Sequence, residues 1–181
     1  MSQPRLFDLP IAGVYPTPLD DANRLLVDWG HRLGPCNRPF HQEAFRLDVG
    51  SRPVAVAISA SSVSAHAGGY DRHELVELAR QAACEPWASR VMLRLWRETL
   101  APLWPCWPVR AAISYSKNSM HTGDLYRFDG WEKFTVNGGS GGGGTYSTKR
   151  APGDAVSGPK TGWMWRFDAV EARAALEARD E

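Results

Sequence analysis

The alternation of hydrophobic and polar residues predicts a pair of strands in the first third of the chain. Residues 44–49 alternate apolar and charged positions, and residues 53–58 form an apolar run directly after Gly50-Ser51. Two such segments around a short turn are typical of a β-hairpin. Upstream, residues 19–33 place apolar side chains at helical spacing and end at Gly34-Pro35, so they predict a helix.

The middle and end of the chain predict alternating helices and strands. Residues 86–100 carry the clearest helical pattern, with one apolar face and a proline at the first position. Residues 74–79 fit a strand or a helix equally well, because so short a run has no decisive periodicity. The remaining predicted elements are strands at 109–115, 131–136 and 163–167, a short helix at 122–128, and a proline-interrupted arm over residues 1–18.

Composition adds few constraints. A chain of 181 residues with 43% hydrophobic content is expected to form one domain, residues 1–181, and its net charge of +1 indicates no particular class of partner. Three cysteines without a CxxC pair fit a reducing, cytoplasmic setting. We expect neither a secretory signal nor a membrane span, since no long apolar run is present.

Several catalytic classes lack their motifs. The five histidines are scattered with no HExxH or HxH, so no metal site is expected. There is no GxxxxGK phosphate loop, and the serines of residues 61–64 lie in no GxSxG turn. Metalloenzyme, P-loop and serine-hydrolase chemistry are therefore disfavoured.

One segment resembles a known superfamily. Residues 122–131, TGDLYRFDGW, place a tyrosine on a short helix before a glycine-aromatic pair, and this resembles the end of the GNAT acyltransferase domain. Residues 77–80 and 86–90 occupy the positions of its coenzyme-binding strand and helix start, so the resemblance covers about residues 40–136. It implies an α/β (α+β) fold in which helices flank a central, mixed, splayed β-sheet.

The resemblance also implies a cofactor, acetyl-CoA or another acyl-CoA. Amide groups at the start of the helix would receive the diphosphate of the coenzyme. The sequence departs from the family at residues 84–87, which contain no glycine and include a carboxylate, so an ordinary helix start is the alternative. The candidate coenzyme-binding residues are Leu78, Ala79, Arg80, Trp87, Ala88, Ser89 and Arg90.

The candidate catalytic residues follow from acyl transfer to an amine. Tyr126 would protonate the departing thiolate, and Glu77 would accept the proton of the amine. Ser114 and Ser116 would orient the acceptor. The structural alternative is packing for Tyr126 and loop capping for Ser114 and Ser116. Further candidates for the base are His41, His73 and His121.

Within the superfamily the sequence most resembles the Mom-type branch of phage proteins, whose namesake modifies adenine in DNA. This resemblance implies a phage-encoded enzyme, in the cytoplasm of a bacterial host, acting on double-stranded DNA. The glycine-rich loop 138–144 would let the segment after it wrap the DNA backbone, which Tyr146, Lys149 and Arg150 would contact. The C-terminal strand and tail, residues 161–181, complete the domain. The alternatives are an acetyltransferase for a small-molecule amine and a GNAT-like binding scaffold without catalysis.

Overall fold

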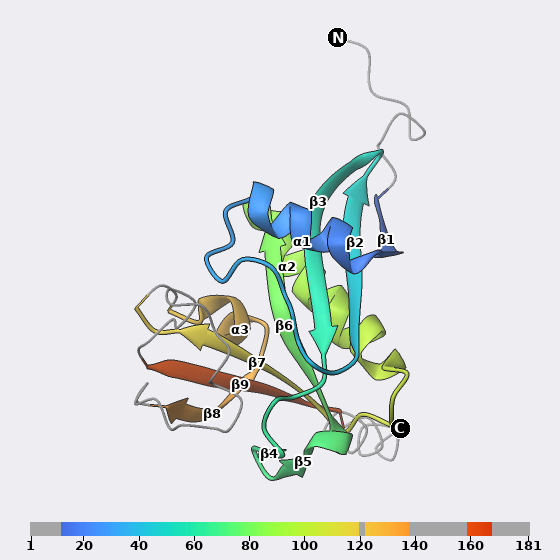
Figure 1. The fold of residues 1–181 in the computed structure, drawn as a ribbon. Coiled ribbons are helices and arrows are strands. Elements are labelled where there is room, and N and C mark those ends of the chain that lie inside the picture. Colours follow the sequence, from blue (N-terminus) through green and yellow to red (C-terminus); the bar gives the residue numbers. More distant parts are fainter. Residues whose placement is uncertain (1–11, 120–121, 138–158, 168–181) are drawn as a thin grey trace, which may run out of the picture.

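The computed structural model describes residues 12–119, 122–137 and 159–167. Its centre is a seven-stranded sheet in the order β1-β2-β3-β6-β7-β9-β8 (Figure 1). The strands of this sheet are β1 (Ala12–Thr17), β2 (Gln42–Val49), β3 (Arg52–Ala60), β6 (Leu75–Ala83), β7 (Ala111–Lys117), β8 (Glu132–Asn137) and β9 (Lys160–Arg166). The strands β4 (His66–Ala67) and β5 (Tyr70–Asp71) form a separate small hairpin.

Neighbouring strands are antiparallel everywhere except at β6 and β7. These two strands run parallel and pair over only four positions, from Leu75 with Ala111 to Leu78 with Ser114. Beyond that point β6 continues beside β3 and β7 continues beside β9, so the sheet opens into two diverging parts (Figure 1). A mixed, splayed sheet was expected, and this is the arrangement found.

A β-bulge lies at the point of divergence. On β3, Ile58 pairs with Arg80 and Ser59 pairs with Leu78, so Ala79 is an extra residue in β6. A bulge bends its strand and increases the local twist. It therefore turns β6 away from β7 at the residue after their last pair.

Helices cover both faces of the sheet. Helix α1 (Leu19–Asp28) buries Ala22 and Leu26 against one face, and α2 (Pro86–Leu95) buries Met92 and Leu93 against the other. In Figure 1, α1 lies in front of β2 and β3 while α2 passes behind them. The two apolar layers follow from the alternation of β3, which sends Val56 to the first face and Ala55 and Ala57 to the second.

The short helix α3 (Asp124–Phe128) is fixed close to β9 by a glycine. Gly123 precedes the helix with φ of +79°, in the left-handed region. A Cβ atom at this position would lie 2.2 Å from the Cζ2 atom of Trp163 on β9. Glycine is required here both for its backbone angle and for the close approach of the helix to the tryptophan.

The other end of α3 is held by a buried arginine. Arg97, which is 5% exposed, donates from Nε to Oδ2 of Asp129 at 2.5 Å and lies over the ring of Trp165 at 3.8 Å. Asp129 also accepts from Nε1 of Trp131 at 3.0 Å. These contacts connect the segment after α2 to both ends of the α3–β8 connection.

Most predicted elements are present. Two helices differ from the prediction, one ambiguous segment is now assigned, and one hairpin is additional. The first helix ends at Asp28 rather than residue 33, since Gly30 adopts a left-handed φ of +67°. The helix predicted over 86–100 changes to π-helical hydrogen bonding over Trp96–Leu100. The ambiguous segment 74–79 belongs to strand β6, because it is paired on both sides. The β4–β5 hairpin was not predicted.

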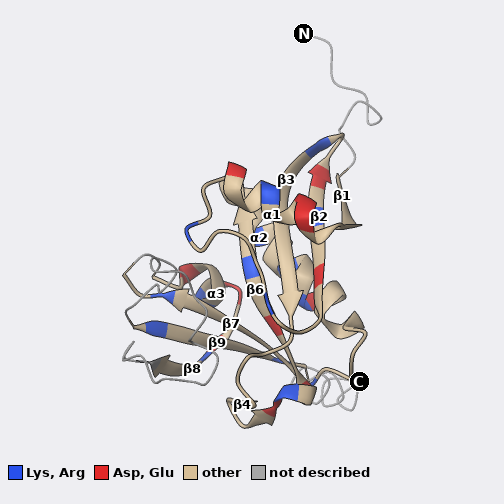
Figure 2. Ribbon diagram, viewed as in Figure 1, with Lys and Arg blue, Asp and Glu red and all other residues tan. Residues whose placement is uncertain are grey.

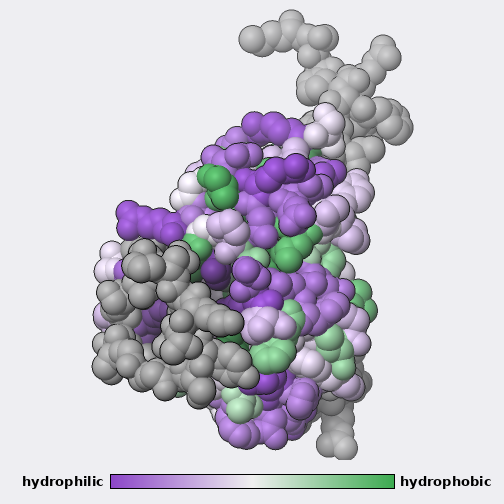
Figure 3. Space-filling model, in the orientation of Figure 1, coloured by the Kyte–Doolittle hydropathy of each residue, from purple (hydrophilic) through white to green (hydrophobic). Residues whose placement is uncertain are grey.

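The surface gives little indication of a membrane or a large apolar interface. In the described part of the chain, every helix is too short or too polar to span a bilayer. On the face drawn in Figure 3, hydrophobic residues form separate patches between hydrophilic ones.

We predict that Gly123→Ala destabilises the protein more than Gly30→Ala does. Both glycines have a positive φ, so each substitution carries a backbone cost of about 1–2 kcal/mol. Only at Gly123 does the added methyl group also collide with Trp163, for an extra cost of about 1–3 kcal/mol, because no atom lies within 4 Å of a Cβ at Gly30. Urea unfolding measures both changes. Equal losses would show that α3 moves away from β9 at no cost.

Candidate active site

The candidate site lies where β6 and β7 separate. Ser114 is the last residue of β7 that pairs with β6, and its Oγ donates to the carbonyl of Leu78 at 3.0 Å. The same Oγ is 2.8 Å from the hydroxyl of Tyr126 on α3. One buried serine thus joins the end of the parallel pairing to the tyrosine predicted as the acid.

Aromatic contacts fix the ring of Tyr126. The ring stacks on Trp163 of β9 with centroids 5.7 Å apart and planes 14° from parallel. It meets Trp131 edge to face at 5.4 Å. Burial raises the pKa of Tyr126 above its ordinary value. The hydrogen bond with Ser114 lowers this pKa, and the charge of Glu77 adds a smaller upward contribution. The hydroxyl therefore keeps its proton at neutral pH.

Glu77 occupies the opposite face of the sheet from Tyr126. Its neighbours on β6, Val76 and Leu78, point into the core beneath α2, so alternation sends Glu77 to the α1 side. There its carboxylate forms an ion pair with Arg38, and the whole residue is only 4% exposed. The acid and the base predicted from sequence are thus placed on the two faces of the sheet, near the residues where its strands diverge.

Burial dominates the electrostatics of Glu77. Loss of hydration raises the pKa of its carboxyl, and the positive charges of Arg38, Arg80 and Lys160 oppose that rise. The basic residues lie on the connection before β2, on β6 and on β9. Figure 2 shows basic positions on β6 and at the ends of β7 and β9 beside the opening.

A second tyrosine lies near Glu77. Tyr115 follows Ser114 on β7, and burial together with the charge of Glu77 raises the pKa of Tyr115 to about 12, although Arg38 lowers it. Its ring meets Phe134 of β8 edge to face at 6.0 Å. The face of the sheet that carries Glu77 is thus lined by a protonated phenol as well.

The start of α2 tests whether the chain can hold a coenzyme. Gln81 of β6 donates from Nε2 to the carbonyl and the Oγ of Ser89, at 2.6 and 3.1 Å, while its Oε1 is buried without a hydrogen-bond partner. The carboxylate of Glu85 is paired with Arg52 at 3.0 Å, so its charge is compensated. Gln81 thus ties β6 to the first turns of α2 and keeps one amide oxygen free to accept a hydrogen bond there.

The predicted coenzyme residues are brought together along β6 and the first turns of α2. Ala79 is the bulged residue, and the side chain of Arg80 reaches the carbonyl of Gly34 on the α1 side. Trp87 is 48% exposed beside the buried Ala88. Pro86 supplies no amide hydrogen, so this helix start has fewer donors than a glycine-rich turn would offer.

The other candidates lie in varied surroundings. Ser116 accepts from Nε1 of Trp163 at 2.8 Å, on the Tyr126 side of the sheet. His41 and His73 contact the rings of Trp104 and Trp107 respectively. His121, Tyr146, Lys149 and Arg150, the glycine-rich loop 138–144 and the tail after Phe167 lie outside the described residues.

Two residues of the site were not predicted. Arg38 lies in a segment without periodicity, and no local pattern pairs it with a glutamate 39 positions away. Trp163 was expected in a terminal strand, where it could stack on a displaced base of the DNA, and not as a contact of Tyr126. Its position under Tyr126 depends on β9 entering the sheet between β7 and β8.

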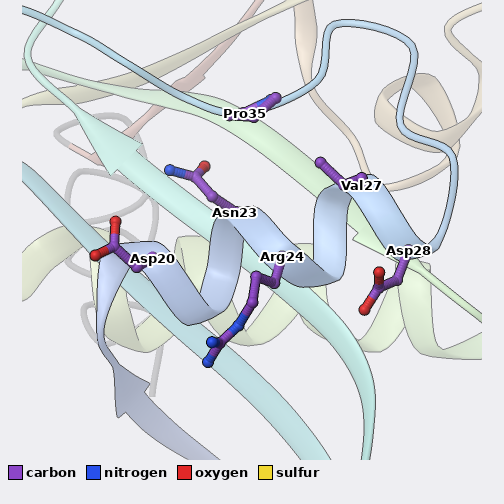
Figure 4. Close-up of a pocket in the computed structure, with 6 residues that line it drawn as sticks. All are labelled: Asp20, Asn23, Arg24, Val27, Asp28 and Pro35. Atoms are coloured by element: carbon purple, nitrogen blue, oxygen red, sulfur yellow. The ribbon is translucent and has the colours of Figure 1, made fainter.

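Neither a metal cluster nor the groove on α1 adds to the site. Within the part of the chain that the structure describes, no group of three His, Cys, Asp or Glu side chains is placed to hold a metal ion. A groove of about 350 Å³ lies on the outer side of α1, away from the residues above (Figure 4). Its lining consists of Asp20, Asn23, Arg24, Val27, Asp28 and Pro35.

Comparison with known proteins identifies the fold. No protein-family model and no curated protein matches the sequence. Solved structures do match. The ribosomal-protein-S18-alanine N-acetyltransferase of Escherichia coli has a TM-score of 0.58 at 13% identity, over 87% of this chain and 94% of that one. NAA60 of Arabidopsis thaliana, in complex with acetyl-CoA, has a TM-score of 0.59 at 7% identity, over 87% and 99%.

A third match is a putative acetyltransferase of the GNAT family from Desulfovibrio desulfuricans, with a TM-score of 0.53 at 11% identity, over 86% of this chain and 99% of that one. This chain has the GNAT fold. The fold predicted from TGDLYRFDGW is therefore confirmed, and the matches extend over nearly the whole GNAT domain. None of them points to the Mom-type branch.

We predict that Glu77 makes the stability of this GNAT domain fall as the pH rises. The pKa of the Glu77 carboxyl is higher in the folded than in the unfolded protein, so the folded state binds the proton more tightly. The difference in free energy of unfolding between wild type and Glu77→Gln is therefore largest at a pH below the ordinary carboxyl pKa. It declines as the pH rises, until Glu77 is ionised in both states. Urea unfolding of both proteins between about pH 4 and pH 8 measures it. An advantage that grows with pH would mean that the ion pair outweighs burial.

Proposed function

We propose that this chain transfers an acyl group from a coenzyme A thioester to an amine. The observation that carries the proposal is the position of two proton-transfer groups beside the separation of β6 and β7. The Tyr126 hydroxyl is tied to the last paired residues by Ser114, and the Glu77 carboxylate lies on the other face of the same strand segment. A donor and an acceptor can thus approach the opening from opposite sides.

Proteins of the same fold support this choice. The solved structures of the same fold include an N-acetyltransferase for the alanine of ribosomal protein S18 and NAA60 in complex with acetyl-CoA. Both concern acyl transfer or its donor. A shared fold does not define the reaction. The proposal of acyl transfer therefore depends on Tyr126 and Glu77, which are suited to act as the acid and the base of the reaction.

The edges of β6 and α2 are the part of the chain suited to holding the coenzyme. The backbone of Leu78, Ala79 and Arg80 borders the opening, and the first turns of α2 with Trp87, Ala88, Ser89 and Arg90 adjoin it. When bound, the thioester supplies an acyl group that is activated toward amines. The buried, unpartnered Oε1 of Gln81 offers an acceptor for a polar hydrogen of the coenzyme.

Tyr126 and Glu77 have the protonation states that the transfer needs. Tyr126 holds its proton at neutral pH and donates it from the hydroxyl to the sulfur of the leaving thiolate. Glu77, once ionised, removes a proton from the attacking nitrogen at its carboxylate, directly or through a water. Ser114 orients the phenol through its 2.8 Å contact, and Trp163 holds the ring in plane.

We predict that Tyr126→Phe lowers kcat for acetyl-CoA-dependent acetylation of an amine by about 10²- to 10⁴-fold, because the proton donor is lost. The phenylalanine keeps both aromatic contacts. Tyr15→Phe, on the exposed outer part of β1, is the matched control and should leave turnover unchanged. Release of free thiol from acetyl-CoA measures the rate. Full activity of a folded Tyr126→Phe protein would remove the tyrosine from the mechanism.

A binding measurement separates the enzyme from a scaffold that has lost the coenzyme. Calorimetry with acetyl-CoA should give a saturable signal, weakened when Ser89→Trp or Arg90→Glu alters the start of α2. Absence of heat at high ligand concentration would favour a binding module, or a donor other than a coenzyme A thioester.

We propose the exocyclic amine of adenine in DNA as the acceptor, with a small-molecule amine as the alternative. The support is the spacing of the elements and the closing aromatic strand, which resemble the Mom-type branch, together with the basic residues that act on Glu77, namely Arg38, Arg80 and Lys160. We predict that DNA from bacteria expressing the protein contains a modified adenine nucleoside, which mass spectrometry of digested DNA detects. The Glu77→Gln and Tyr126→Phe proteins should produce less of it. If the DNA is unmodified while the protein acetylates a small amine in vitro, the small-molecule amine is the acceptor.

A further inference from the structure

The connection between α1 and β2, residues 29–41, is fastened to the helix by one asparagine. Asn23 of α1 donates from Nδ2 to the carbonyl of Cys36 at 3.2 Å and accepts the amide hydrogen of Cys36 on Oδ1 at 2.7 Å. Cys36 is itself 1% exposed. Two backbone groups of the connection are thus satisfied by a single side chain, as β-strand pairing would satisfy them.

The far end of the connection is fastened to the sheet. The amide of Ser61, just after β3, donates to the carbonyl of His41 at 3.2 Å. The side chain of Gln42 donates to the carbonyl of Arg38 at 3.2 Å. Arg38 therefore lies between two attachment points, and Figure 1 shows the connection crossing the sheet in front of β6 and β3.

From this position Arg38 reaches the carboxylate of Glu77. The two side chains are 19% and 5% exposed, so the ion pair is largely removed from water. Such a pair is sensitive to the loss of one partner, because the other charge then stays buried without compensation. The charged and titratable groups that act on Glu77 or feel its charge are Arg38 and Cys36 of the connection, Arg80 of β6, Lys160 of β9, Tyr115 of β7 and Tyr126 of α3.

Arg38 is distinguished within this group by its contact. Its guanidinium forms an ion pair with Glu77, and its charge also acts on the thiol of Cys36. The guanidinium of Arg80 donates to the carbonyls of Gly34 and Ala79. Arg80 and Lys160 also act on Glu77 through their charge.

We propose that Arg38 is a positioning residue for acyl transfer: the connection fastened by Asn23 delivers its guanidinium to Glu77, stabilises the ionised form of that carboxylate, and aims it toward the acceptor amine. The role of Arg38 in the reaction rests on the function proposed above. Its effect on Glu77 does not, and the two can be measured separately. The position of the acceptor amine would then depend on the connection before β2 as well as on the sheet.

The first test follows the ionisation of Glu77 directly. In protein carrying ¹³C-labelled glutamate, the carboxyl resonance of Glu77, assigned by its loss in Glu77→Gln, is titrated in wild type and in Arg38→Gln. Removing the paired charge should raise its pKa by about 1 to 3 pH units. Arg38→Lys should restore most of the wild-type value, because it returns the charge without the planar guanidinium.

The second test follows the reaction. The acid limb of kcat/KM against pH should move upward in Arg38→Gln by the same amount as the NMR titration, so that activity lost near neutral pH returns at higher pH. Asn23→Ala, which removes both hydrogen bonds to Cys36, should move the acid limb in the same direction, but by a smaller amount. Arg24→Gln, at an exposed ion pair with Asp21 on α1, is the control and should change neither profile.

The outcomes separate the two proposals. An unshifted carboxyl titration in a folded Arg38→Gln protein would overturn the role of Arg38, whatever the enzyme does. A uniform loss of activity at all pH values, without a shift, would also overturn it, since a purely structural role gives that result. A shifted titration in a protein that acetylates no amine would leave the Arg38–Glu77 relationship standing and refute the proposed function.

Discussion

The structure depends on the early end of the pairing between β6 and β7. Parallel strands leave backbone donors and acceptors exposed wherever their pairing stops, and unpaired groups of this kind are costly when buried. Here pairing stops after Leu78 and Ser114, the bulge at Ala79 turns β6 away, and β7 remains paired with β9. The result is a separation of two strands in the middle of the sheet, with Ser114, Tyr126 and Glu77 close to their last paired residues.

The same geometry keeps Tyr126 and Glu77, the proposed acid and base, apart. A phenol in direct contact with the carboxylate would donate its one hydrogen to that carboxylate instead of to another group. Alternation along β6 puts Glu77 on the α1 side, while Ser114 holds Tyr126 on the α2 side. Each group then acquires its own surroundings, an ion pair for the carboxylate and two indole rings for the phenol. Burial raises both pKa values, but only the carboxylate has positive charges to oppose that rise.

The sequence predicted the elements better than their contacts. Periodicity located both hairpin strands, the long helix and the strand of residues 109–115, and the motif TGDLYRFDGW indicated the fold. What local patterns could not supply were long-range pairings. The Arg38–Glu77 ion pair joins residues 39 positions apart, and the bulge at Ala79 is visible only once β3 and β6 are aligned. The helix boundaries at Asp28 and Leu95 were also missed: Gly30 was a local stop signal that the prediction passed over in favour of Gly34-Pro35, and the π-helical turn has no distinct pattern in the sequence.

The position of β9 has a consequence for the order in which the protein matures. This strand is the last described element of the chain, yet it lies between β7 and β8, and it supplies Trp163, the platform on which Tyr126 rests. A nascent chain that has emerged only as far as β8 therefore has the tyrosine but nothing beneath it, and β7 still has an open edge. Assembly of the site must await insertion of a strand across a long sequence separation, a slow step by the usual relation between contact order and folding rate. A chain shortened within β9 would therefore lose the ring on which Tyr126 rests together with the strand that pairs with both β7 and β8.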